Sequence, residues 1–239
     1  MLFLPPAPRA CVLLVAPLFE EKRCAHRALV TCAEALAADG AAVLLPDLSG
    51  AGNSDGRPAE IGLERWLDDL QAAADYLQGR AEAPLCLIGC RAGALLATRL
   101  PAAARLLLWQ PVLSGKNYLR QLRTRRMVQD AITGEKPRIG PYEVEGQELS
   151  ASLFAVIETL ALPDAPPSGD VRLLQCSFQD HLLTEYTRLA ARWPHLQTRC
   201  LVSEPFWNPH TPAGYAELAA ALTEEALLPP PGRGRIELK

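Results

Sequence analysis

The residues best placed to do chemistry lie in a sharp turn bounded by Gly89 and Gly93. The apolar run at 85–88 predicts a buried strand, and a helix is expected over 91–100. Turns of this small-x-nucleophile-x-small type hold a serine, cysteine or aspartate at the centre. Here the central residue is Arg91, whose guanidinium stays protonated at ordinary pH and cannot attack a carbonyl. The sequence therefore predicts that nucleophilic chemistry is missing or replaced.

The charge of Arg91 needs a partner, because a cation at a helix N-terminus is unfavourable by about 0.3–1 kcal/mol when exposed. One alternative is a carboxylate of the chain, which would make a filled, inactive pocket. Another is an anionic ligand, such as phosphate, sulfate or a carboxylate, bound between Arg91 and the N–H of Ala92. A third is that Arg91 points to solvent. The sequence leaves all three open.

Cys90 is a possible substitute nucleophile. If it stood at the centre of the turn, the small positions would shift to Ile88 and Ala92, and a β-branched residue tolerates such close approach poorly. A buried, small apolar role is the alternative interpretation. The seven cysteines include no C-x-x-C pair, so we expect reduced thiols, with no disulfide framework, no metal site and no cofactor.

Strands alternate with helices along the chain, which predicts an α/β fold with a doubly wound, mainly parallel sheet. Strands are expected at 10–16, 41–46, 85–88, 105–109, 171–176 and 198–202, and helices at 26–39, 61–77, 91–100, 184–192 and 213–227. N-terminal antiparallel strands are expected to be absent, because little chain precedes Ala10.

The alternation breaks at 114–162, and we interpret this stretch as a small cap inserted into a core formed by 1–113 and 163–227. Residues 228–239 are expected to form a flexible tail. The cap includes four closely spaced arginines, Arg120, Arg123, Arg125 and Arg126. They form either a solvated helix face or a cleft lining that attracts anions.

Composition narrows the class of protein further. The 239 residues carry a net charge of -3, which argues against general nucleic-acid binding. The longest apolar N-terminal run is too short to span a bilayer, and no signal peptide is expected. We therefore expect a cytoplasmic protein. The sequence does not indicate its oligomeric state.

Three segments together resemble the α/β-hydrolase superfamily. Residues 46–54 are similar to its D-x-x-G-x-G-x-S loop, 66–70 to the helix before the turn, and 89–93 to the nucleophile elbow. Within the superfamily, the arginine at the elbow, the APLFEEKR segment at 16–23 and the EPFW segment at 204–207 resemble the exosortase A system-associated hydrolase 2 group. This resemblance implies a cytoplasmic protein encoded beside bacterial exopolysaccharide and protein-sorting machinery. The group is called hydrolase largely by its fold.

The resemblance places Glu20 and Glu21 in the loop that normally supplies oxyanion-binding N–H groups beside the elbow. Two carboxylates there would oppose a developing negative charge, which argues against ester hydrolysis. They are also the best internal partners for Arg91. The alternative is that both are solvated surface charges.

The resemblance also assigns the acid position to Asp180 and the histidine position to His210, in the family's chain order. Without a nucleophile, this pair could act at most as a general base on water. The segment around His210 reads equally well as a turn before a helix.

Two functions follow. The first, which we favour, is a non-classical or catalytically inactive member that binds an anionic small molecule or an acidic partner around Arg91. The second is a hydrolase of ester or related bonds, in which Asp180 and His210 activate water and Arg91 anchors the substrate.

Overall fold

A computed structural model describes residues 1–101, 103–134, 140–208 and 214–227. The described chain forms a sheet of seven strands in the order β1-β3-β2-β4-β5-β8-β9, in which six neighbouring strands run parallel. The strands are β1 (Leu2–Phe3), β2 (Ala10–Val15), β3 (Ala41–Leu44), β4 (Leu85–Cys90), β5 (Arg105–Trp109), β8 (Asp170–Ser177) and β9 (Gln197–Val202). The expected α/β fold with a mainly parallel sheet is confirmed.

The expected absence of N-terminal antiparallel strands is wrong. The short strand β1 pairs antiparallel with β3, with Leu2 opposite Leu44. The N-terminal ammonium group of Met1 donates a hydrogen bond of 2.7 Å to the carbonyl of Leu45. The few residues before Ala10 are therefore enough to pair with the edge of the sheet.

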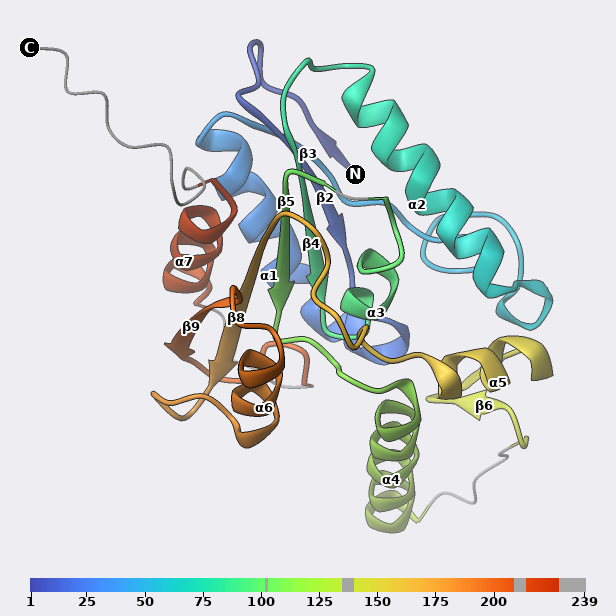
Figure 1. Ribbon diagram of the computed structural model, residues 1–239. Coiled ribbons are helices and arrows are strands. Elements are labelled where there is room, and N and C mark those ends of the chain that lie inside the picture. Colours follow the sequence, from blue (N-terminus) through green and yellow to red (C-terminus); the bar gives the residue numbers. More distant parts are fainter. Residues whose placement is uncertain (102, 135–139, 209–213, 228–239) are drawn as a thin grey trace, which may run out of the picture.

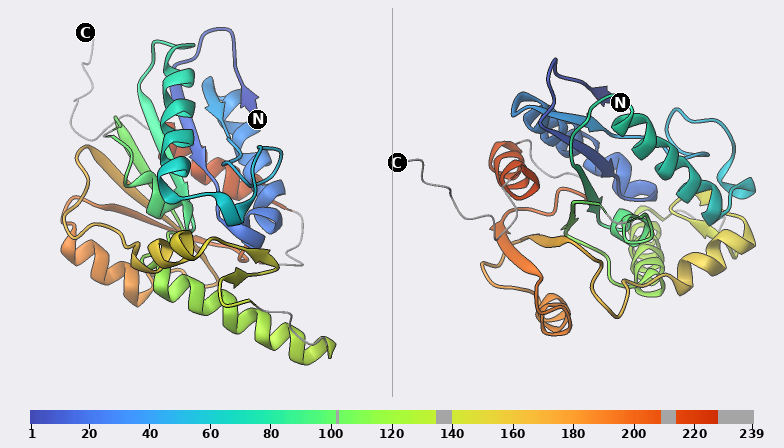
Figure 2. Two further views of the ribbon diagram at one scale, coloured as in Figure 1. Left: turned by 90° about the vertical axis from the view of Figure 1, so that its right-hand side faces the viewer. Right: turned by 45° about the horizontal axis from the view of Figure 1, so that its top comes forward.

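Helices cover both faces of the sheet (Figures 1 and 2). The helix α1 (Phe19–Ala38) packs with α7 (Ala216–Leu227) on one face, and α2 (Leu63–Gln78), α3 (Gly93–Ala97) and α6 (Thr184–Arg192) share the core of the other. Alternate residues of β2 separate the two layers. Val12 and Leu14 face α1 and α7, whereas Leu13 and Val15 face α2 and α3, as the period of two in a strand requires.

The predicted bounds of two helices, the one before the elbow strand and the one after the elbow, are wrong. The helix α1 begins at Phe19, seven residues before the expected start, so Glu20 and Glu21 lie in its first turn. Acidic residues are favourable there because they face the positive end of the helix dipole. The helix α3 spans only five residues, where ten were expected.

The segment between β5 and β8 lies beyond the carboxyl ends of the strands (Figures 1 and 2). It contains α4 (Gly115–Thr133), the hairpin of β6 (Glu143–Val144) and β7 (Gln147–Glu148), and α5 (Ala151–Thr159). We call this segment, residues 114–162, the insertion. Its two ends are joined by hydrogen bonds from Gly115 N–H to Leu160 C=O, 2.8 Å, and from Leu162 N–H to Leu113 C=O, 3.1 Å. Among the described helices, none is long and apolar enough to cross a membrane.

Candidate functional site

The turn between β4 and α3 is strained at its centre. Arg91 has a φ of 52°, which few residues with a side chain adopt. The glycines on either side allow the close approach. A Cβ on Gly89 would lie 2.6 Å from the Ala94 Cα, and one on Gly93 would lie 2.4 Å from the Ala16 carbonyl oxygen. The Arg91 N–H donates to the Trp109 carbonyl at 3.0 Å, which ties the turn to β5.

The Arg91 side chain makes a forked contact with Glu21. Its Nε donates to Glu21 Oε2 at 3.2 Å and its Nη2 to Oε1 at 3.0 Å. A further donor, Nη1, reaches the Gln110 carbonyl at 3.3 Å. The Trp207 ring lies against the guanidinium, 4.4 Å from its central carbon to the ring centroid. The two charged side chains are 10% and 2% exposed, so the pair is held almost out of water.

Burial alone would lower the pKa of Arg91, but the adjacent Glu21 carboxylate outweighs burial and holds that pKa above its ordinary value. The same apolar surroundings raise the pKa values of two buried phenols, Tyr118 and Tyr186. Their hydroxyls donate to the carbonyls of Leu18 and Pro111 at 3.1 and 2.8 Å. These residues therefore serve to hold the chain around the ion pair.

A second arginine, from α4, joins the pair. Arg125 Nη2 lies 3.4 Å from Glu21 Oε1, and its Nε lies 3.4 Å from Glu145 Oε1. Its Nη1 donates to Asn208 Oδ1 at 3.5 Å. We call Glu21, Arg91, Arg125 and Glu145 the charge cluster. It connects α1, the elbow and the insertion through alternating charges.

The other three of the four closely spaced arginines make contacts within the insertion or face solvent. Arg126 pairs with Asp130 at 2.8 Å, and Arg123 donates to the Pro141 carbonyl and lies over the Phe154 ring. Arg120 is exposed. Sequence reasoning treated the four arginines as one group, either a solvated helix face or a cleft lining, but the fold gives them different surroundings.

Glu145 is a member of the charge cluster that sequence reasoning missed. It stands at the tip of the β6–β7 hairpin with a φ of 49°, followed by Gly146 at 87°. Two successive positive φ values are typical of a tight two-residue hairpin turn. The Glu145 carboxylate accepts a hydrogen bond of 3.2 Å from the Glu20 N–H, which lies in the first turn of α1. The available signal was the Glu145-Gly146 pair, which marks a turn but does not indicate what the carboxylate contacts.

Burial raises the pKa of Glu145 to about 7, despite the lowering effects of Arg125 and the Glu20 N–H; Glu21 and Glu20 add to the rise. The folded state therefore holds this proton more tightly than the unfolded state, where the pKa is near its ordinary value of 4.5. The resulting stability is present at acid pH and is lost as the pH rises from about 4.5 to about 7.

The variant Glu145→Gln removes this titration. Urea unfolding of both proteins at about pH 5 and about pH 8 measures the effect. We expect the free energy of unfolding of the unmodified protein, relative to Glu145→Gln, to be lower at the higher pH. A relative stability that stays constant or rises between the two pH values would contradict the assignment.

Glu20 does not join the charge cluster through its side chain. Its carboxylate instead contacts Arg23, one turn further along α1, with 2.9 Å from Arg23 Nε. The hydrogen bond and charge of Arg23 hold the pKa of Glu20 below its ordinary value. Of the two expected partners, only Glu21 contacts Arg91.

Cys90 and Ala92, the neighbours of Arg91, are fully buried. Cys90 packs with the residues that face α1 and α7, and burial raises the pKa of its thiol well above the ordinary value. A thiol that stays protonated is a poor nucleophile. Ala92 precedes α3, whose single short turn offers little helix dipole for an anion.

Of the two expected catalytic residues, the structure describes only Asp180. Asp180 follows β8 with 89% of its side chain exposed, and it lies 3.3 Å from the neighbouring His181. His210 lies outside the described residues. Within the described residues, no group of histidine, cysteine and acidic side chains could hold a metal ion.

Solved structures of similar shape belong to one fold class, the α/β-hydrolases. Est1E from Butyrivibrio proteoclasticus, solved with ferulic acid bound, matches with a TM-score of 0.64 at 18% identity, over 94% of this chain and 92% of that one. An esterase from Pyrococcus furiosus matches with a TM-score of 0.62 at 14% identity, over 91% and 81%. An α/β serine hydrolase without a lid, from Xanthomonas campestris, matches with a TM-score of 0.59 at 15% identity, over 98% and 89%. At these identities the likeness establishes the fold alone.

A family model described as serine aminopeptidase, S33, matches residues 6–151, which is more than half of the chain. The protein therefore belongs to this family of α/β-hydrolases. No curated protein matches the sequence.

Proposed function

We propose that this protein is a catalytically inactive α/β-hydrolase, in which Arg91 replaces the elbow nucleophile and serves as the centre of an internal charge cluster. The observation that carries the proposal is the forked, buried contact between Arg91 and Glu21. A guanidinium has no electron pair to offer a carbonyl carbon, and one fixed by a carboxylate is not free to do other work.

The position of Glu21 supports the loss of acyl-transfer chemistry. A carboxylate beside the elbow would face the oxyanion of a tetrahedral intermediate, where hydrolases place hydrogen-bond donors. The like charges would raise the barrier rather than lower it. Arg125 and Glu145 also reach this region from the insertion. The insertion then acts as a cap that ion pairs hold against the core.

Most hydrogen-bond donors of the Arg91 guanidinium are already used by contacts within the chain, so few are left for an anionic ligand. Its Nε and Nη2 contact Glu21, its Nη1 contacts Gln110, and one face lies against Trp207. This favours neutralisation by the chain over capture of phosphate or sulfate at the elbow. We therefore infer that the protein acts by binding a partner through other surfaces.

The hydrolase alternative rests on Asp180 and His210 activating water. The exposure of Asp180 and its contact with His181 weigh against it, because an orienting carboxylate is normally buried against its histidine. The motifs at 16–23 and 204–207 favour the exosortase-associated group, and the second places Trp207 on Arg91. We propose on this basis a cytoplasmic protein that belongs with exopolysaccharide and protein-sorting machinery.

Turnover of a broad panel of p-nitrophenyl esters tests the proposal. We expect no rate above that of buffer for the unmodified protein, and none for Arg91→Ser, because the Glu21 carboxylate, without its forked partner, would then stand beside the new hydroxyl. Circular dichroism establishes that each sample is folded. Turnover by the unmodified protein that disappears in His210→Ala would establish the hydrolase alternative instead. Ester turnover gained by Arg91→Ser would contradict the proposal, because it would mean that the site beside the elbow can still stabilise an oxyanion.

A further inference from the structure

The outward face of α4 exposes large apolar side chains near its C-terminal end. Met127, Val128 and Ile132 are 66%, 54% and 76% exposed. At about 100° per residue, Val128 and Ile132 are neighbours on adjacent turns, and Met127 lies about 100° round the helix from Val128. The buried side of the same helix is occupied by Tyr118, Leu119 and Leu122 near its N-terminal end. Exposed aliphatic side chains gathered in this way are costly in water unless something covers them.

The same helix concentrates positive charge in a chain whose net charge is -3. It carries five basic residues and one acidic residue, Asp130. Arg125 and Arg126 are engaged in ion pairs, but Lys116 and Arg120 are exposed. Helical spacing puts both of these on the side that Met127 shares further along the helix. The outward half of the helix therefore carries basic side chains near its N-terminal end and apolar side chains near its C-terminal end.

The shape of this region selects among possible partners. The helix α4 projects past the core, and its C-terminal end lies far from the sheet (Figures 1 and 2). A protruding helix end is well covered by a partner that can close around it. Acyl chains do so without a matching groove, and anionic headgroups complement the neighbouring basic side chains.

From these observations we propose that α4 docks the protein on an anionic lipid surface. Met127, Val128 and Ile132 enter the headgroup boundary, and Lys116 and Arg120 contact lipid phosphates. A second copy of the chain is a poorer occupant, because two basic α4 faces would repel each other. An acidic protein is the remaining competitor. The proposal concerns a surface away from Arg91 and does not depend on the lack of catalysis.

Flotation of the full chain with vesicles tests docking. We expect binding to vesicles of mixed phosphatidylcholine and phosphatidylglycerol, weak binding to phosphatidylcholine alone, and release by high salt. Arg120→Glu is expected to weaken binding at least about fivefold, since one basic residue near such a surface contributes about that factor. Ile132→Asp should weaken binding by at least a comparable factor, because it places a charge in the apolar boundary.

Matched controls use equally exposed residues elsewhere. Phe178→Asp replaces a side chain that is 71% exposed, and Arg57→Glu one that is 80% exposed, and neither should change binding. Failure to float with either vesicle would overturn the proposal, as would binding that α4 variants and controls affect equally. Sedimentation velocity tests whether α4 instead mediates self-association of the chain. A dimer that Ile132→Asp abolishes, or capture of an acidic protein without vesicle binding, would assign the face to a protein instead.

Discussion

Arg91→Met is expected to lower the free energy of unfolding by about 3–5 kcal/mol, the cost typical of breaking a buried ion pair from one side. Methionine keeps much of the volume and the apolar contact with Trp207 but removes the charge. Glu21, 2% exposed, would be left with Arg125 at 3.4 Å as its nearest cation among the described contacts. The loss should therefore come mainly from a buried carboxylate that has lost its forked partner.

A double-mutant cycle separates this charge effect from lost packing. Glu21→Gln keeps the shape of the side chain and removes its charge, and Arg91→Met with Glu21→Gln removes both charges. We expect the double variant to be more stable than Arg91→Met alone, with a coupling energy in the range of about 1–3 kcal/mol. Urea unfolding of the four proteins measures it. Strictly additive losses would mean that the two groups do not interact as described.

Asp170→Asn is expected to have the second largest effect, a loss of about 3 kcal/mol. Asp170 Oδ2 lies 2.8 Å from Arg105 Nε and 3.2 Å from Arg172 Nη2, and all three side chains are less than a tenth exposed. Arg105 also donates to the carbonyls of Glu225 and Ala226 at the end of α7, at 3.1 and 2.6 Å. The aspartate thus neutralises the arginine that fastens α7 to the sheet.

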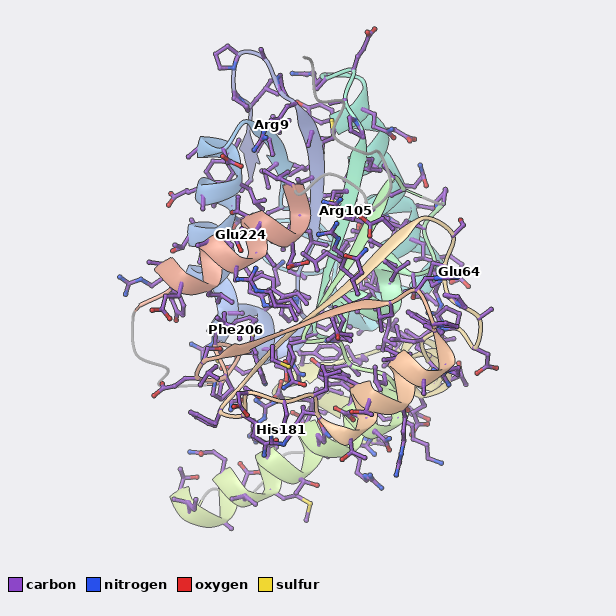
Figure 3. The ribbon with its side chains drawn as sticks, turned by 60° about the vertical axis from the view of Figure 1, so that its left-hand side comes forward. Arg9, Glu64, Arg105, His181, Phe206 and Glu224 are labelled. Atoms are coloured by element: carbon purple, nitrogen blue, oxygen red, sulfur yellow. The ribbon has the colours of Figure 1, made fainter. Side chains whose placement is uncertain are left out.

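The matched control is Asp39→Asn, the same substitution in an exposed pair with Arg9, whose side chains are 56% and 52% exposed. Such pairs contribute roughly 0–1 kcal/mol because water screens them. In Figure 3, Arg9 lies near one end of the molecule, Arg105 closer to its middle and His181 toward the other end. Asp170 and Arg105 begin β8 and β5, whereas Arg91 bonds to Trp109 at the far end of β5, so we expect neither substitution to disturb the charge cluster. Thermal unfolding compares the two variants. Equal losses would show that burial does not set the strength of the Asp170 contacts.

The sequence was sufficient to predict the main elements of the fold. The strand at 105–109 and the helix at 184–192 match β5 and α6, because both are bounded by clear breaks in the apolar pattern. The elbow was also predictable from sequence, since its glycines allow a close approach that few other residues permit. The early start of α1 was not, because Phe19-Glu20-Glu21 carries no capping side chain and reads as a loop.

The charge cluster could be predicted only in part, because its contacts join distant segments. Glu20 and Glu21 were the expected partners of Arg91 only if the chain itself neutralised its charge, and the fold selects the second because successive residues of a helix point about 100° apart. Arg125 lies 104 residues from Glu21 along the chain, and no local pattern links them. Glu145 has no apolar periodicity to place it, so its role depends entirely on where the hairpin docks.

Labelling with a fluorophosphonate tests the central claim most directly, because this reagent reports an activated nucleophile without knowledge of the substrate. Intact-mass spectrometry of the unmodified protein should show no adduct, since Arg91 occupies the elbow and Glu21 holds it. A stoichiometric adduct on any serine, threonine or cysteine would reveal a working nucleophile elsewhere and would contradict the account.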